Sequence, residues 1–115
     1  MSDLISVIVP CFNEQEALPF FYREICKVAL ELKEKHCVDF ELLFVNDGSR
    51  DQTLSLLREL STKDSRVKYI SFSRNFGKES AIYAGLENAS GNYISMIDAD
   101  LQDPPSLLLE MYELI

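Results

Sequence analysis

Hydrophobic residues occur along the chain in short continuous runs that are separated by longer amphipathic stretches. The runs lie at residues 4–9, 40–45, 67–72 and 93–97, and β-branched and aromatic side chains are frequent in them. Continuous hydrophobicity of this length is typical of strands that are covered on both faces. The pattern therefore predicts four buried strands.

The first two amphipathic stretches are predicted to be helices. Asn13 and Glu16 have the spacing of a capping box, so we expect Asn13 to be the N-cap of the first helix. The second helix is expected to start near residues 49–51. Hydrophobic residues recur at helical spacing in both stretches, at Leu18, Phe21, Ile25 and Val28 in the first and at Leu54, Leu57 and Leu60 in the second.

Two further helices are predicted in the second half of the chain. The third is expected to run from about Lys78 to Ala89, with Gly91 as a C′ residue just beyond its end. Its small residues, Ala81, Ala84, Gly85 and Ala89, would let it lie close to a sheet. The fourth is expected to begin with Pro104 at its first position and Asp103 as its N-cap.

These elements predict an α/β fold with the order βαβαβαβα. The short connections favour a Rossmann-like parallel sheet with right-handed crossovers. No linker, repeat or low-complexity segment divides residues 1–115, so they are predicted to belong to one domain. Little chain follows the acidic residues near position 100, and we therefore expect this domain to be part of a longer protein.

Composition narrows the classes of function. The formal net charge of −8 disfavours a nucleic-acid-binding surface, and the hydrophobic content of 47% excludes a disordered chain. The three cysteines, Cys11, Cys26 and Cys37, lack metal-type or redox-type spacing and are expected to be reduced thiols of a cytosolic protein. His36, in a polar stretch, is expected to be a solvated surface residue. The sequence contains no recognisable signal peptide or transmembrane-length segment.

Polar residues follow every predicted strand, in the segments 10–14, 46–49, 73–78 and 98–103. The connections at the opposite edge of the sheet carry only scattered charge. The carboxyl ends of parallel strands meet at one edge, which is where open α/β sheets bind ligands. The asymmetry therefore predicts a single functional site on that edge.

The segment after the fourth run is the strongest indication of chemistry. Asp98, Asp100 and Asp103 are crowded together with the amide of Gln102. Carboxylates this close repel one another by several kcal/mol unless something compensates them, and a hard divalent cation with oxygen ligands is the best candidate. For Asp98, Asp100 and Gln102 we favour a metal site. For Asp103 we favour the structural role of a helix cap.

The other three segments each have two interpretations. Segment 46–49 could be a turn with a helix cap, or Asp47 could accept hydrogen bonds from a nucleobase or ribose. Phe12 could belong to the core or stack on a base. Arg74 and Lys78 could be solvated, or could face phosphates at the positive N-terminus of the third helix.

Together these residues resemble the N-terminal half of family 2 glycosyltransferases, which have the GT-A fold. Residues 7–14 resemble the opening strand of that family, residues 46–49 its nucleotide-binding turn, and Asp98-Ala99-Asp100 its D-x-D metal motif. The extended motif 98–104, with segment 73–78 upstream, is similar to the polyprenyl-phosphate branch, which includes dolichyl-phosphate mannose synthases. The resemblance covers essentially the whole chain. Phe12 replaces a common tyrosine, and Asn46 a frequent aspartate.

The resemblance implies roles for individual residues. Pro10, Phe12 and Glu14 would line the nucleoside pocket, with Asp47 at the base edge and Lys78 near the phosphates. Asp98 and Asp100 would be the catalytic carboxylates: Asp98 would contact the nucleotide, and Asp100 with Gln102 would hold Mg²⁺ or Mn²⁺ against the diphosphate. The list of implied nucleotide-binding residues is thus Pro10, Phe12, Glu14, Asp47, Lys78 and Asp98.

The implied activity is transfer of a sugar from a UDP- or GDP-sugar, with polyprenyl phosphate as the expected acceptor in cell-envelope glycan synthesis. We expect the full-length protein to work at the cytoplasmic face of a membrane through its C-terminal part. The present segment is expected to be soluble, cytoplasmic and inactive alone. The alternatives are a Mg²⁺-dependent phosphotransfer domain of the receiver type, which would need an acidic pair after the first strand, and a non-catalytic nucleotide-binding module.

Overall fold

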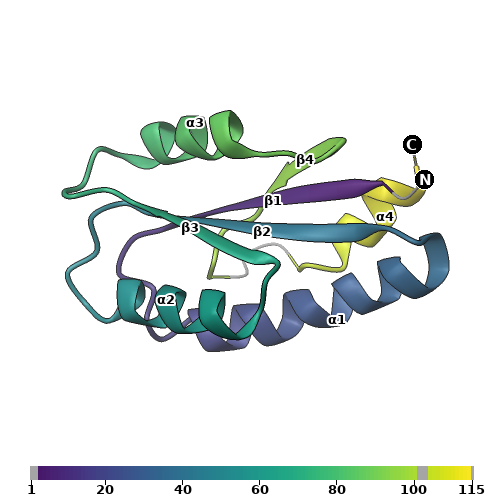
Figure 1. The fold of residues 1–115 in the computed structure, drawn as a ribbon, viewed down its shortest axis with the longest axis horizontal. Coiled ribbons are helices and arrows are strands. Elements are labelled where there is room, and N and C mark those ends of the chain that lie inside the picture. The colour runs from purple at the N-terminus through teal and green to yellow at the C-terminus, as the bar shows by residue number, and fades with distance from the viewer. Residues whose placement is uncertain (1–2, 101–103, 115) are drawn as a thin grey trace.

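The computed structural model describes residues 3–100 and 104–114, and a parallel sheet forms the centre of this part of the chain. Its strand order is β3-β2-β1-β4 (Figure 1). The strands are β1 (Leu4–Cys11), β2 (Asp39–Asn46), β3 (Val67–Ser71) and β4 (Tyr93–Met96). All three neighbouring pairs are parallel. The predicted α/β fold with a parallel sheet is confirmed.

Helices cover both faces of the sheet. They are α1 (Leu18–His36), α2 (Thr53–Lys63), α3 (Lys78–Asn88) and α4 (Leu107–Glu113). Figure 1 shows α1 and α2 below the sheet and α3 above it, and α4 packs against α1. This arrangement explains the hydrophobic runs of β1 and β2, because both faces of these central strands are buried. The prediction of four buried strands is wrong for β3 and β4, which lie at the two edges of the sheet and are largely exposed or half-buried.

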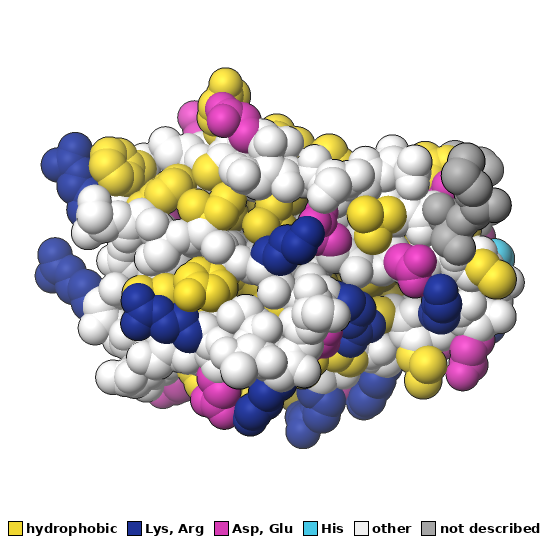
Figure 2. Space-filling view, viewed as in Figure 1, with side chains coloured by type: hydrophobic (Ala, Val, Ile, Leu, Met, Phe, Trp, Pro, Cys, Tyr) yellow, Lys and Arg dark blue, Asp and Glu magenta, His cyan; other side chains and the backbone are white. Residues whose placement is uncertain are grey.

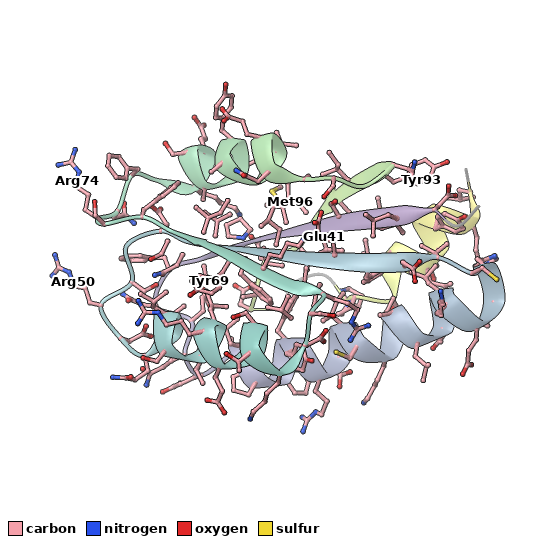
Figure 3. The ribbon with its side chains drawn as sticks, in the orientation of Figure 1. Glu41, Arg50, Tyr69, Arg74, Tyr93 and Met96 are labelled. Atoms are coloured by element: carbon pink, nitrogen blue, oxygen red, sulfur yellow. The ribbon has the colours of Figure 1, made fainter. Side chains whose placement is uncertain are left out.

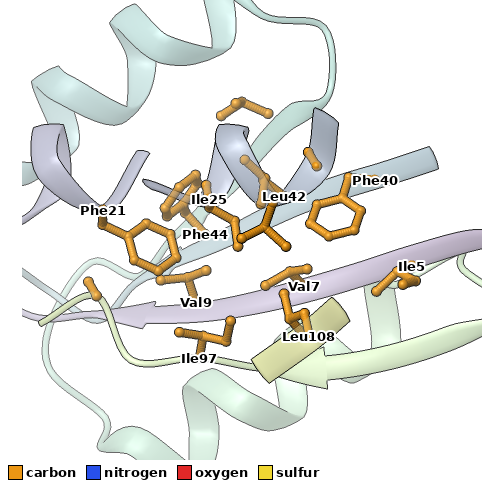
Figure 4. Packing of buried hydrophobic residues seen from close by; sticks show 14 of the residues in the cluster. Ile5, Val7, Val9, Phe21, Ile25, Phe40, Leu42, Phe44, Ile97 and Leu108 are labelled. Atoms are coloured by element: carbon orange, nitrogen blue, oxygen red, sulfur yellow. The ribbon is translucent and has the colours of Figure 1, made fainter. Parts of the chain in front are cut away.

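The main core lies between the sheet and α1 (Figure 4). Val9 on β1 and Phe44 on β2 pack against Phe21 and Ile25 of α1, and all four side chains are fully buried. The rings of Phe21 and Phe44 meet edge to face, with centroids 6.0 Å apart. Burial stabilises the fold by roughly 1.5–3 kcal/mol for each large side chain of this kind. This layer is what fixes β1 and β2 as the platform for the site.

The opposite face of the sheet has a smaller core, which depends on the small residues of α3. Ala81 packs with Ile8 and Val45, and a Cβ atom at Gly85 would lie 2.5 Å from Cγ2 of Ile8. The predicted close approach of this helix is therefore confirmed. Figure 2 shows hydrophobic side chains beneath α3 on this face, where Ile70 and other partly buried residues border the smaller core.

One buried carboxylate lies within this second face. Glu41 on β2 is 4% exposed, and its oxygens accept hydrogen bonds from Ser6 Oγ at 2.6 Å and Lys68 Nζ at 2.7 Å. The backbone N–H and the hydroxyl of Ser90 donate to it at 3.0 and 2.9 Å. Burial alone would raise the pKa of Glu41, but these donors outweigh it and lower the pKa to about 2. The carboxylate thus joins three strands and the loop before β4 (Figure 3).

The first helix does not begin where the capping-box pattern predicts. α1 starts at Leu18 with Ala17 as its N-cap, so the prediction of Asn13 as N-cap is wrong. Asn13 has a φ of 54°, and its side-chain oxygen accepts a hydrogen bond from the backbone N–H of Arg50 at 2.9 Å. The asparagine therefore connects two loops that are distant in sequence.

Other helix boundaries also differ from the predictions. α2 begins at Thr53, later than expected, because Asp51 accepts the N–H and the hydroxyl of Thr53 in a turn that precedes the helix. α4 begins at Leu107, after two turn hydrogen bonds to Pro104 and Pro105, so the placement of Pro104 at its first position is wrong. The predicted cap Asp103 lies outside the described residues.

The end of α3 agrees with the prediction within one residue, but the role assigned to Gly91 is wrong. The helix ends at Asn88, and its C-cap Ala89 is extended, so Gly91 is not a C′ residue. The N–H of Gly91 instead donates to Ser6 Oγ at 2.8 Å, which brings the chain back to β1.

Several smaller features complete the description. None of the described helices is both long enough and apolar enough to cross a membrane. All three cysteines are free thiols, with Cys11 buried and Cys37 exposed. His36 is exposed as expected, but it also contacts α4: its Nε2 atom lies 3.0 Å from Oε2 of Glu113, and its ring lies against Tyr112.

Candidate active site

An open cavity of about 260 Å³ lies at the carboxyl ends of β1, β2 and β4. Every predicted site residue that the structure describes lines it: Pro10, Phe12, Glu14, Asp47, Lys78, Asp98 and Asp100. Gln102, the other predicted metal ligand, lies outside the described residues. The structure therefore brings together four segments that are separated by up to ninety positions in the sequence.

The position of the cavity follows from the topology of the sheet. The chain proceeds from β1 outward to β2 and β3, and then returns to place β4 on the other side of β1. The strand order thus reverses between β1 and β4, and a crevice lies at the carboxyl ends of these two neighbouring strands. Cys11 ends β1, and Asp98 and Asp100 follow β4, so this crevice contains the predicted motif.

The loop after β1 is attached firmly to the loop after β2. The N–H of Asn13 donates to Ser49 Oγ at 2.9 Å, and the N–H of Glu14 donates to Thr53 Oγ1 at 2.9 Å. Together with the bond from Arg50 to Asn13, these contacts fix the backbone on either side of Phe12 and Glu14. Phe12 itself is 45% exposed, which leaves its ring available for stacking at the cavity wall.

Asp47 occupies the junction between the second and third loops. One carboxylate oxygen accepts the N–H of Phe76 at 2.7 Å, and the other accepts the N–H of Gly77 at 3.0 Å and Nδ2 of Asn75 at 3.2 Å. The side chain is 4% exposed. Through these three hydrogen bonds Asp47 holds the segment that leads into α3. Asp47 thus positions the start of α3 as well as lining the cavity.

Gly48 is required at this junction for two reasons. Its φ of 70° lies in the left-handed region that favours glycine. A Cβ atom there would lie 2.3 Å from the backbone of Arg74 and Asn75, so the two loops pack without room for a side chain. Segment 46–49 therefore reverses the chain as the turn interpretation predicts, and it also supplies Asp47 to the cavity. The helix cap in that interpretation is wrong, because the N-cap of α2 is Gln52. Arg50 and Arg74 project outward from these loops (Figure 3).

The cavity is acidic, with one compensating charge from α3. Nζ of Lys78 lies 2.8 Å from Oδ1 of Asp98, and the two side chains are 56% and 36% exposed. Burial and the nearby carboxylates of Asp100, Asp51 and Asp98 raise the pKa of Glu14 above its ordinary value. The negative potential thus exceeds what Lys78 neutralises. A site of this kind favours a cation or a ligand that brings one.

A divalent metal such as Mg²⁺ needs several oxygen ligands close together. Among the described residues, no three His, Cys, Asp or Glu side chains lie close enough together to hold a metal ion. Asp98 and Asp100 nevertheless supply hard oxygen donors beside a cavity that also holds the carboxylates of Glu14 and Asp47. The chemistry of these donors fits Mg²⁺ or Mn²⁺, with further oxygens needed from the ligand or from residues near Asp100.

Sequence reasoning missed several residues that build this site. Cys11 and Ala99 line the cavity from within two of the predicted segments, although no role was assigned to either of them. Burial, followed by the charges of Glu14 and Asp51, raises the pKa of the Cys11 thiol. Thr53 positions Glu14 through a contact between residues 39 positions apart. Only Asp51, in the turn signal before α2, could have been identified from its sequence context.

The parallel sheet with an acidic cavity at the carboxyl ends of β1 and β4 is the architecture of a Rossmann-like α/β protein with a site at the carboxyl edge of its sheet. The glycosyl transferase family 2 model matches residues 6–115. The chain therefore belongs to glycosyl transferase family 2. This membership decides against the phosphotransfer alternative of the receiver type.

Related proteins and structures agree with this assignment. The chain is 52% identical over 108 residues to the uncharacterized glycosyltransferase YkcC of Bacillus subtilis, covering 94% of this chain and 32% of that protein. It is 46% identical over 109 residues to the prophage bactoprenol glucosyl transferase homolog of Escherichia coli, covering 95% and 34%. The chain thus spans about a third of the length of these relatives.

Two solved structures have the same fold. Residues 1–349 of Staphylococcus aureus TarS superpose with a TM-score of 0.72 at 25% identity, covering 100% of this chain and 32% of that one. The mannosyltransferase PcManGT of Pyrobaculum calidifontis, solved with GDP-Man and Mn²⁺, has a TM-score of 0.71 at 24% identity, covering 87% and 28%. The likeness to PcManGT is evidence for the fold alone.

Proposed function

We propose that this chain is the donor-binding part of a glycosyltransferase that moves a sugar from a nucleoside diphosphate to a polyprenyl phosphate. The observation that carries the proposal is the convergence of seven predicted residues on one acidic cavity. Relatives named bactoprenol glucosyl transferases support the acceptor class, at 46% identity for the examples from Shigella phages SfV and SfII.

The nucleoside would bind against the wall formed by the first two loops. The ring of Phe12 offers a stacking surface, and Pro10 and Glu14 line the cavity beside it. Asp47 already accepts three donors from loop 75–77, and its remaining lone pairs are the acceptors available to a base edge. This geometry favours a base that presents an N–H group, as uracil and guanine do.

The diphosphate would lie between Lys78 and the acidic pair. The ammonium group of Lys78 and the N-terminus of α3 attract phosphate oxygens. Asp98 would contact the ribose, and Asp100 with Gln102 would hold a divalent cation. A bound Mg²⁺ or Mn²⁺ would supply Lewis-acid stabilisation of the charge that develops on the leaving nucleotide.

The acceptor needs little from this part of the chain. The oxygen of a polyprenyl phosphate is already anionic, so its attack on the anomeric carbon requires no strong general base. The chain spans about a third of the relatives' length, and the proposal assigns acceptor contacts and membrane association to the remainder of a full-length protein. We expect the 115-residue chain to bind donor nucleotide without transferring sugar.

Thermal unfolding with UDP and GDP, each with and without Mn²⁺, tests the donor site. A nucleotide at a hundred times its dissociation constant should stabilise the fold by about 2.7 kcal/mol, which corresponds to a Tm increase of roughly 10 °C. We expect this increase with one nucleotide, and only when Mn²⁺ is present. It should disappear in Asp100→Asn, because that change removes a charged oxygen ligand.

Asp39→Asn is the matched control. Asp39 is exposed and paired with Lys33 at the opposite end of the sheet, so the same chemical change there should leave the nucleotide effect intact. A metal-independent increase, or an equal loss in both variants, would contradict the proposed site. A folded chain that responds to neither nucleotide would also contradict the proposed donor site.

A further inference from the structure

Lys78 has a distinctive place in the charge distribution of the cavity. Among the described residues that line it, Lys78 is the one cation, facing the four acids Glu14, Asp47, Asp98 and Asp100. Asp47 is held by donors from loop 75–77. The ammonium of Lys78 is directed at Asp98, with Nζ and Oδ1 2.8 Å apart. The pair therefore connects the first residue of α3 to the acidic motif.

This ion pair is exposed to solvent, and its partners can separate easily. The Lys78 side chain is 56% exposed and that of Asp98 is 36% exposed, so solvent weakens the pair and the flexible lysine stem can leave it at little cost. The backbone at the start of α3 is fixed separately, through the N–H groups of Phe76 and Gly77 on Asp47. Lys78 can thus change its contact while the helix stays in place.

We propose that Lys78 is a resident counter-cation, which pairs with Asp98 until a metal–nucleotide complex binds and then transfers to the diphosphate. This inference rests on the proposed donor site. With Lys78 in place, a divalent cation that binds alone at Asp100 meets the positive charge of Lys78 on the neighbouring Asp98, and its binding is weakened. A bound diphosphate has the opposite effect, because it attracts the ammonium group of Lys78 away from Asp98. Asp98 can then contact the nucleoside.

The consequence is that Lys78 makes binding of the metal and of the nucleotide interdependent. Lys78 weakens the binding of the free metal and strengthens the binding of the nucleotide. Each ligand therefore raises the affinity for the other by more than their direct contact would. Removing the charge should therefore change the two affinities in opposite directions. A residue that only supports the fold would weaken both.

The test compares wild type with Lys78→Gln. Binding of Mn²⁺ alone is measured from the EPR signal of the free ion, and binding of UDP and GDP is measured by calorimetry at saturating Mn²⁺. We expect Lys78→Gln to bind Mn²⁺ about fivefold more tightly, from the loss of one charge at short range across a wet cavity. It should bind the nucleotide about five- to tenfold more weakly, from the loss of a charge-assisted contact.

Two further variants separate charge from structure. Lys78→Arg keeps the positive charge and should keep both affinities close to those of wild type. Lys35→Gln removes a lysine from the surface of α1, where it pairs with Glu31, and should change neither affinity. Thermal unfolding of each variant confirms that the fold is retained, which is expected because both lysines are exposed.

The outcomes are distinguishable. Opposite changes in Lys78→Gln, absent from Lys35→Gln, would support the exchange of partners. Changes in the same direction, or no change in either affinity, would overturn it while leaving the donor site intact. If wild type binds neither Mn²⁺ nor nucleotide, the proposed function fails and this inference fails with it.

Discussion

Replacing Glu41 with glutamine should reveal how much one buried carboxylate contributes to this fold. Its four donors come from three side chains and one backbone N–H, and a glutamine amide would turn its own N–H₂ toward some of them. The pKa of Glu41 is lowered from 4.5 to about 2. A tenfold change in proton affinity corresponds to about 1.4 kcal/mol, so the full effect would be about 3 kcal/mol.

Solvent screening reduces this free-energy contribution, because the side chain of the partner Lys68 is 58% exposed, whereas that of Glu41 is 5% exposed. We therefore expect Glu41→Gln to lower the free energy of unfolding at pH 7 by about 2–3 kcal/mol. The pH dependence has a definite sign. A carboxylate whose pKa is lowered by folding stabilises the protein fully above the unfolded value near 4.5, and this contribution is lost as pH falls toward 2.

Urea unfolding of both proteins at pH 7, 4.5 and 3 measures the difference directly. The difference in the free energy of unfolding between wild type and Glu41→Gln should be largest at pH 7 and should decrease steadily as pH falls below 4.5. Glu59→Gln is the matched control, because Glu59 pairs with Lys63 on the surface and should contribute little. The reasoning would be refuted if this difference were equally large at pH 3. It would also be refuted if Glu41→Gln lowered the free energy of unfolding no more than Glu59→Gln does.

Two further predictions concern the loop junction and the thiols. Gly48→Ala should lower Tm by several degrees and weaken Mn²⁺-dependent nucleotide binding at least tenfold, because its Cβ atom would displace the loop of Arg74 and Asn75. Calorimetry measures the affinity, and circular dichroism checks that the secondary structure is unchanged. A variant that binds nucleotide with the affinity of wild type would contradict the prediction. Iodoacetamide should modify Cys37 first and Cys11 only after unfolding, since Cys11 is buried and its thiol pKa is raised. Peptide mass spectrometry identifies the order, and early labelling of Cys11 would contradict the described packing.

The central strands β1 and β2 could be predicted from the sequence because their burial on both faces is a local property, whereas the burial expected for the edge strands β3 and β4 was wrong. Residues 40–45 lack the regular polar alternation of a half-exposed strand, although they include Glu41, and β2 indeed has seven consecutive buried residues after Asp39. The small residues of α3 correctly predicted its close approach to the sheet, because a side chain at Gly85 would clash with Ile8. The edge of the sheet that carries the cavity follows from these elements alone.

The loops could not be predicted in the same way, because contacts between distant segments decide their conformations. The spacing of Asn13 and Glu16 is a local signal for a cap, but Asn13 bonds instead with Ser49 and Arg50. Asp47 similarly takes its partners from loop 75–77, nearly thirty residues further on. The residues of the site could therefore be identified from motifs, whereas the contacts that position them required the structure.

The place of β4 in the sheet also has a consequence for how the protein folds. β4 pairs with β1, and the bond from the N–H of Leu4 to Asn92 joins residues 88 positions apart. Pairing of β1 with β2 closes a much shorter loop, so β1, β2 and β3 can associate before β4 has left the ribosome. The segment with Asp98 and Asp100 takes its place only when β4 docks. Acquisition of nucleotide binding during refolding should therefore lag behind formation of the helices, and it would serve as a kinetic marker of the completed fold.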